Sequence, residues 1–242
     1  MKKRTKIILS ICLVLLLMIG IGGFAYVSDY CHADAQAAAA MTADTGTVHT
    51  EQSDSVTWFV PDEPTAGLIF YPGGKVECSA YAPLMLACAQ RGILCALVQM
   101  PCNLAVLDMN AADGLREEHP EITDWYIGGH SLGGVMAANY AASHPQELDG
   151  LVLLAAYSTK DLTHTQLRVL SVYGTQDGVM NRESYEEYKS NLPGGMTELI
   201  IEGGCHAQFG CYGTQDGDGV PEISGGEQIR LTADAIAAFV IC

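Results

Sequence analysis

Residues 124–134 carry the sequence DWYIGGHSLGG, in which an apolar run leads into a glycine-rich turn. We expect a strand over 124–128 and, after the turn, a helix of small residues over 131–143. The turn contains the pattern G-x-S-x-G, with Gly129 and Gly133 on either side of Ser131. A tight strand-to-helix turn of this kind needs glycine beside the serine and lifts the hydroxyl above the edge of a sheet. The sequence therefore predicts a nucleophile at Ser131, although a turn that only binds an anion or packs would match the same pattern.

Strand and helix patterns alternate on both sides of this turn. The expected strands span 48–51, 55–60, 67–71, 93–100, 124–128, 151–156, 167–173 and 197–201, and the expected helices span 83–91, 104–118, 131–143, 182–191 and 226–240. The first two strands predict an antiparallel hairpin. The remainder predicts an α/β fold, with a mostly parallel central sheet and helices on both faces. Ligands of such sheets bind beyond the carboxyl ends of the strands, so reactive groups are expected directly after each strand.

A serine nucleophile needs a general base, and the base needs a carboxylate to orient it. Of the seven histidines, His206 alone lies in the turn after the last expected strand. Asp177 lies just after the strand 167–173, which predicts a triad in the chain order Ser131, Asp177, His206. Asp161 is the alternative acid, and Asp177 could instead cap a turn.

Negative charge that develops on a carbonyl oxygen during acyl transfer is stabilised by fixed N–H donors. The backbone N–H of Leu132 is one expected donor, because it follows the nucleophile. The second donor is expected in the loop after the strand 67–71, at Gly74 or at Lys75. The side chain of Lys75 has no expected role.

Four segments resemble the cap-less α/β-hydrolases often labelled hydrolase fold 5. They are FYPGGKV at 70–76, GGHSLGG at 128–134, YGTQDGV at 173–179 and GGCHAQFG at 203–210. The resemblance covers the chain from about Gly67 onward and implies the same triad of Ser131, Asp177 and His206. Cys205 departs from the group, in which asparagine is expected, and suggests a loop disulfide or an altered pocket wall. The resemblance implies little about the substrate, because the substrates of this group are not well defined.

Lid domains in this fold are often inserted where residues 157–166 lie, and that segment is too short to form one. We therefore expect an open site for small or exposed substrates, with Tyr157, Phe209 and Met100 as pocket residues by position alone. The predicted reaction is hydrolysis of a carboxylic ester through an acyl-enzyme, with no metal or organic cofactor. A thioesterase, amidase or peptidase would use the same triad. A non-catalytic binding module on a hydrolase scaffold is the alternative from another class.

The N-terminal segment predicts a membrane span. Residues 7–27 contain no charged side chain and are long enough to cross a bilayer. The basic residues that precede them predict a cytoplasmic start and an extracytoplasmic domain. A cleaved signal peptide, with a cleavage motif at 33–35, is the competing interpretation, but the apolar run is longer than is usual for one. The expected organisation is a basic tail with an anchor or signal segment at 1–27, a linker at 28–46 and a hydrolase domain at 47–242.

The charge of the chain argues against some partners. The formal net charge is −16, and all 28 acidic residues lie beyond Val27. Such a surface repels phosphate backbones and anionic headgroups, so we expect no nucleic-acid partner.

Cysteines and acidic residues suggest further sites, each of which has a simpler interpretation. Most of the nine cysteines follow the apolar segment, in a compartment that permits disulfides, and pairs within 205/211 and 78/102 are guesses. Cys88 and Cys95 fit buried small hydrophobic residues. Residues 216–219, DGDG, lack the later ligands of a calcium loop and predict a solvated acidic turn. No second ligand pair accompanies residues 205, 206 and 211 to complete a metal site.

Overall fold

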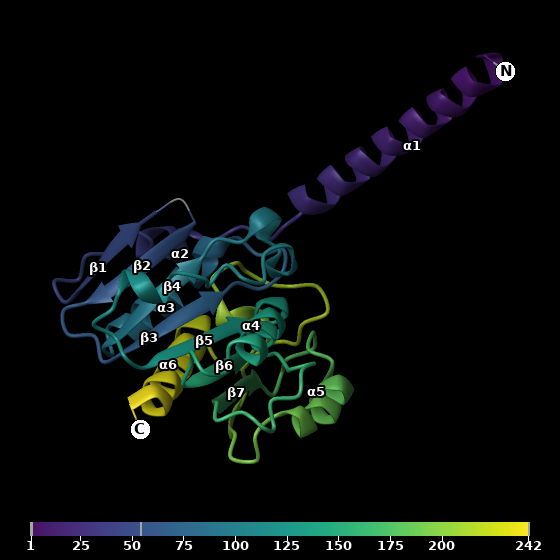
Figure 1. Cartoon of the computed structure of the whole chain (residues 1–242). Helices are drawn as coiled ribbons and strands as arrows, with labels where there is room; N and C mark the ends of the chain where they lie inside the picture. Colours follow the sequence, from purple (N-terminus) through teal and green to yellow (C-terminus); the bar gives the residue numbers. More distant parts are fainter. Residues whose placement is uncertain (1, 54, 242) are drawn as a thin grey trace. The chain divides into compact units, whose positions relative to one another are not determined.

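The computed structural model of the chain describes residues 2–53 and 55–241 and divides into two units (Figure 1). The first unit ends at Tyr30 and consists mainly of the helix α1 (Lys2–Ser28). Its stretch Lys6–Ser28 has a mean hydropathy of 2.8 and is long and apolar enough to cross a membrane, a criterion that a signal sequence also meets. The second unit begins at Cys31.

The second unit is built on one eight-stranded sheet in the order β1-β2-β4-β3-β5-β6-β7-β8. The strands are β1 (Val48–Gln52), β2 (Val56–Pro61), β3 (Ala66–Tyr71), β4 (Ile93–Val98), β5 (Trp125–His130), β6 (Gly150–Leu154), β7 (Arg168–Gly174) and β8 (Thr197–Ile201). Strand β2 pairs antiparallel with β1 and with β4, whereas all other pairs are parallel. The predicted hairpin and parallel sheet are confirmed.

Helices cover both faces of the sheet, as expected (Figure 1). They are α2 (Ala35–Ala40), α3 (Ala82–Ala89), α4 (Leu132–Ser143), α5 (Arg182–Tyr188) and α6 (Gly225–Ile241). Buried residues of α3 and α6 belong to one hydrophobic cluster, and those of α4 to a second cluster. Helix α4 packs on β5 and β6, which positions its N-terminus at the carboxyl edge of the central strands.

The segment 104–118 forms no α-helix, so the helix predicted there is wrong. It contains two short 3₁₀ turns, η3 (Ala105–Leu107) and η4 (Arg116–Glu118). The hydroxyl of Tyr71 donates to the carbonyl of Met109 at 3.0 Å and accepts from the N–H of Ala112 at 2.9 Å. Because these two backbone groups bond to a side chain of β3, they are withdrawn from the ladder that a helix requires.

The segment predicted as a linker belongs in large part to the second unit. The N–H of Cys31 donates to Lys75 O at 2.8 Å, and Cys31 O accepts from Glu77 N at 2.9 Å. Helix α2 is capped by Asp34 and buries the side chains of Ala37 and Ala40. The alanine-rich stretch within the expected linker forms a helix whose apolar face packs near α3, and the second compact unit begins at Cys31.

The cysteines of the described residues are all free thiols, and neither guessed disulfide is present. Cys78 is buried with its Sγ 3.4 Å from Val98 O, whereas Cys102 is exposed. Cys88 and Cys95 are fully buried in the first cluster, as expected for small hydrophobic residues.

Candidate active site

The turn between β5 and α4 holds Ser131 in a strained conformation. Its φ of 51° and ψ of −123° lie where a non-glycine residue is rarely found. Adjacent chain segments force this geometry, because a Cβ placed on Gly129 would lie 2.6 Å from the backbone carbon of Gly133. Ser131 is half-buried at the carboxyl end of β5. The local structure is that of a nucleophile elbow, in which strain aims the hydroxyl away from the sheet.

His206 and Asp177, which follow β8 and β7, are brought together. The Nδ1 atom of His206 lies 2.9 Å from Oδ2 of Asp177, and both side chains are buried. The second carboxylate oxygen of Asp177 accepts from the N–H groups of Val179 at 3.0 Å and Met180 at 2.9 Å. The carboxylate is therefore fixed by its own loop and presents one oxygen to the imidazole, which selects the tautomer with the proton on Nδ1.

The other ring nitrogen of His206 is left open. Within residues 2–53 and 55–241, Nε2 of His206 is buried and has no hydrogen-bond partner. In the described part of the chain, Ser131 and His206 are therefore not joined by a hydrogen bond at this nitrogen. Catalytic hydrogen bonds of this type are often long before substrate binds. A buried hydrogen-bond acceptor without a partner lowers the free energy of unfolding. Such unsatisfied groups in native proteins often have a catalytic role.

Gly74 and Leu132 lie against each other beside the elbow. A Cβ placed on Gly74 would lie 2.7 Å from Cδ2 of Leu132. The N–H of Lys75 donates to Asn103 O at 2.8 Å, and the N–H of Gly73 donates to the hydroxyl of Tyr81 at 3.1 Å. Of the two residues predicted as the second oxyanion donor, Lys75 thus has its N–H bonded to Asn103 O.

A row of buried side chains connects the loop at Gly73 to His206. The hydroxyl of Tyr81, which accepts from Gly73, lies 2.8 Å from Nδ1 of His130. The ring of His130 in turn lies 4.4 Å, centroid to centroid, from the ring of His206. Burial and, next, the proximity of His206 hold the pKa of His130 well below its usual value. His130 is therefore neutral, and its uncharged ring packs beside the base.

The three residues proposed for the pocket do not share one environment. Phe209 is fully buried, with its ring 5.5 Å from that of His130. Met100 is buried in the second hydrophobic cluster, whereas Phe209 belongs to the first. Tyr157 is half-buried and stacks on Tyr188 at 5.3 Å. The structure thus brings only Phe209 of the three beside the histidines.

Asp161, the alternative acid, is engaged locally. Its Oδ1 accepts from the N–H of Thr163 at 2.9 Å and from the hydroxyl of Thr163 at 2.6 Å. The Asp161 side chain is exposed and stabilises its own turn. The imidazole of His206 is bonded by Asp177 instead.

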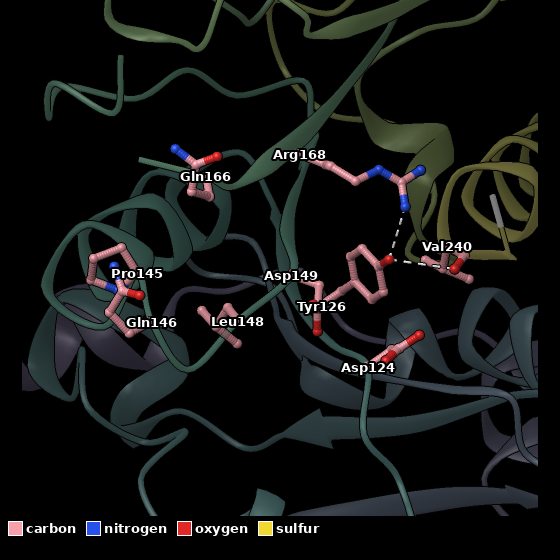
Figure 2. Close-up of a pocket in the computed structure, with 9 residues that line it drawn as sticks. All are labelled: Asp124, Tyr126, Pro145, Gln146, Leu148, Asp149, Gln166, Arg168 and Val240. Carbon is pink, nitrogen blue, oxygen red and sulfur yellow. Dashed lines mark hydrogen bonds between the residues drawn. The ribbon is translucent and has the colours of Figure 1, made fainter. Parts of the chain in front are cut away.

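A separate cavity of about 400 Å³ lies at the opposite edge of the sheet (Figure 2). Its lining includes Tyr126 near the start of β5 and Arg168 at the start of β7, whereas Ser131 follows the end of β5. The guanidinium of Arg168 donates to the Tyr126 hydroxyl at 3.1 Å, and that hydroxyl donates to Val240 O at 3.4 Å. These polar groups are satisfied within the protein, and the cavity is remote from the elbow.

In the described part of the chain, no three His, Cys, Asp or Glu side chains gather in a way that could hold a metal ion.

Comparison with known proteins identifies the family and the fold. A family model described as the alpha/beta hydrolase family matches residues 67–230, and the chain belongs to that family. No curated protein matches the chain in sequence. The expected fold is thereby confirmed, together with its lack of a lid, because residues 155–167 between β6 and β7 contain no helix or strand.

Solved structures show the same fold at low identity. A predicted CIB-like hydrolase from Thermoplasma acidophilum has a TM-score of 0.57 and 16% identity, over 79% of this chain and 98% of that chain. TT1662 from Thermus thermophilus has a TM-score of 0.59 and 13% identity, over 81% and 99%. Est1E from Butyrivibrio proteoclasticus has a TM-score of 0.56 and 13% identity, over 81% and 98%.

Residues 81, 130 and 218 contribute to this region without having been predicted to do so. Tyr81 lies in the short 3₁₀ helix η1 (Cys78–Tyr81), and only the fold brings it to His130. His130 is visible in the sequence as the residue before the nucleophile, but its neutral state follows from burial. Asp218 lies in the turn predicted to be solvated, yet it accepts four backbone hydrogen bonds.

Proposed function

We propose that this protein is a serine hydrolase that cleaves carboxylic esters of small or exposed substrates through an acyl-enzyme. The observation that carries the proposal is the state of His206. Its Nδ1 is fixed by Asp177 at 2.9 Å, while its buried Nε2 has no partner among the residues described. This is the arrangement that a general base needs before it takes the proton of a serine hydroxyl.

In the proposed first half-reaction, Ser131 Oγ attacks the ester carbonyl carbon and its proton moves to Nε2 of His206. The carboxylate of Asp177 stabilises the imidazolium that forms. The tetrahedral intermediate then expels the alcohol, which receives the proton from Nε2. The acyl group remains on Ser131 as an ester.

In the second half-reaction, water attacks the acyl-enzyme. His206 accepts the proton of that water, and the collapsing intermediate releases the carboxylic acid and regenerates the Ser131 hydroxyl. Every proton in the cycle passes through Nε2, so the reaction requires no other acid or base.

The oxyanion of both intermediates would accept from the backbone N–H groups of Leu132 and Gly74. The close approach of Gly74 to the Leu132 side chain supports this pairing, since it places the two residues next to each other beside Ser131. One such donor typically stabilises the transition state by about 3–4 kcal/mol. Because the donors are backbone N–H groups, their position and direction depend on the conformation of the loops that carry them.

The short β6–β7 connection supports a site that is open to small or protruding esters. The same triad could cleave thioesters and amides. The shape of the pocket around the leaving group determines which of these substrates is preferred. A feruloyl ester belongs among the test substrates because Est1E, a structural neighbour, has been solved with ferulic acid bound.

We further propose that α1 anchors the protein in a membrane with the catalytic unit on the extracytoplasmic side. The length and hydropathy of Lys6–Ser28 support a span, and the basic residues before it support this orientation. N-terminal sequencing of the protein purified from membranes tests the anchor. An intact N-terminus supports it, and a new N-terminus within residues 28–36 would identify a cleaved signal peptide instead.

The activity is tested with the full-length protein in detergent. Turnover of p-nitrophenyl acetate, butyrate and octanoate, a feruloyl ester, a thioester and an anilide is compared with that of Ser131→Ala. We expect turnover of short esters that Ser131→Ala lowers by at least about 10³-fold. A folded parent protein that hydrolyses none of these compounds would contradict catalysis and favour a binding module.

A further inference from the structure

Asp218 lies in the long connection that follows the base, between η6 (Ala207–Phe209) and α6. Its Oδ1 accepts from the N–H groups of His206 at 3.1 Å, Gly178 at 3.2 Å and Gly219 at 3.0 Å. Its Oδ2 accepts from the N–H of Ala207 at 2.8 Å. One carboxylate therefore binds the backbone of the base itself and the backbone directly after the triad acid.

The two loops that Asp218 joins carry the acid and the base. Gly178 follows Asp177, and the His206 N–H belongs to the residue that Asp177 must orient. The backbone provides a second link, because Gly219 N donates to Gln176 O at 3.1 Å. The position of the imidazole relative to its carboxylate thus depends on a side chain 12 residues beyond the base.

The charge of Asp218 suits this role. Burial by itself raises the pKa of its carboxyl, but hydrogen bonds from the backbone of Ala207, Gly178, His206 and Gly219 outweigh burial and hold the pKa below its ordinary value. The side chain is ionised at neutral pH, and an ionised carboxylate accepts such bonds more strongly than a neutral amide. Asp216, two residues earlier, is exposed.

We propose that Asp218 is a positioning residue for the reaction, which fixes the imidazole of His206 against Asp177 through the backbone of both loops. This inference rests on the proposed function for its effect on turnover, but its structural part stands on the hydrogen bonds alone. Replacement of Asp218 should lower kcat with little change in KM, because both oxygens of its carboxylate are engaged by the backbone of the two loops.

The experiment compares the full-length protein with Asp218→Asn and with Asp216→Asn as a matched control. Asparagine keeps the size of the side chain but removes the charge and one acceptor oxygen. Three quantities are measured: kcat and KM on the best ester, the folded fraction by circular dichroism, and the downfield proton signal of the His206–Asp177 hydrogen bond by NMR. Asp177→Ala assigns that signal, since it removes the acceptor.

We expect Asp218→Asn to lower kcat by about 10–100-fold per folded molecule, to leave KM within about 2-fold and to shift or abolish the downfield signal. Asp216→Asn should match the parent protein in all three. If Asp218→Asn does not accumulate as folded protein, Asp218→Glu keeps the charge, displaces the carboxylate by one methylene and is expected to show the same pattern.

The inference is overturned if the variant keeps the parent kcat, or if kcat falls while the downfield signal is unchanged. A parent protein that shows the signal but hydrolyses no ester would contradict the proposed function. In that case, loss of the signal in Asp218→Asn alone would still support the positioning role.

Discussion

The carboxylate of Asp177 accepts two backbone hydrogen bonds on one oxygen and lies 2.9 Å from the His206 imidazole with the other. One oxygen holds the loop and the other bonds the imidazole, so Asp177→Asn tests the second role separately. In this variant the amide oxygen can keep the loop bonds while the amide nitrogen faces Nδ1. That nitrogen is a donor, so the imidazole is driven to the wrong tautomer. We predict a fall in kcat of about 10³–10⁴-fold with the fold retained.

Steady-state kinetics and thermal unfolding of Asp177→Asn test this prediction. Asp161→Asn is the control, because the carboxylate of Asp161 is bonded within its own turn to Thr163 and its loss should leave turnover unchanged. Activity of Asp177→Asn within about 10-fold of the parent protein would show that another group orients the base.

Gly74→Ala tests the oxyanion site. The new Cβ would lie 2.7 Å from Cδ2 of Leu132, so the Leu132 side chain or the loop must shift, and we expect this shift to disturb the proposed donors. We expect kcat to fall by about 10²-fold while KM changes less. Gly195→Ala, at a position with no atom within 4 Å of the new Cβ, is the control for adding a methyl group. Equal kinetics for both variants would remove Gly74 from the mechanism.

His130 predicts a pH dependence of stability. Its pKa in the folded state is well below its usual value because burial and the neighbouring His206 disfavour the charged ring. The unfolded chain therefore binds the proton first as the pH falls, and stability decreases below about pH 6.5. His130→Phe should flatten this decrease, by up to about 1.4 kcal/mol per pH unit.

Urea unfolding at several pH values between 7 and 5 measures this difference. His49→Gln alters an exposed histidine and should follow the parent protein. The same slope for the parent protein and His130→Phe would mean that folding does not lower the pKa of His130.

Helix α2 should contribute to the stability of the catalytic unit. Ala37 is fully buried, whereas Ala38 on the same helix is exposed. Ala37→Glu would place a charge in the contact, and we expect it to lower the free energy of unfolding by about 1–3 kcal/mol. Ala38→Glu should change it by less than about 0.5 kcal/mol. Equal stability of the two variants would show that α2 does not stabilise the catalytic unit, as is expected of a linker.

Much of the fold follows from local sequence. The apolar runs of β3, β4 and β6 are buried on both faces, so their pattern is continuous and their limits are predicted to within about two residues. The helix expected at 104–118 failed for a tertiary reason, because the Tyr71 hydroxyl binds its backbone. The alanine-rich segment near Ala37 was assigned to a linker, since small residues give no strong apolar period even where they pack.

The candidate site likewise contains residues that the sequence predicts and residues that it does not. Ser131, Asp177 and His206 can be proposed from the sequence because each lies in the connection that follows a strand, and the carboxyl ends of parallel strands meet at one edge. Asp218 follows no strand, and its sequence context is that of a solvated turn. Only the folded loop shows that its carboxylate reaches the backbone of His206, so no local pattern could have indicated it.

The central claim is that Ser131 is an activated nucleophile, and mass spectrometry after treatment with a fluorophosphonate tests it most directly. The full-length protein in detergent is treated with the probe, digested and mapped. We predict one phosphonylated residue, Ser131, with no adduct in Ser131→Ala and much slower labelling in His206→Ala. Folded protein that remains unlabelled, or an adduct on another residue that persists in Ser131→Ala, would contradict the account.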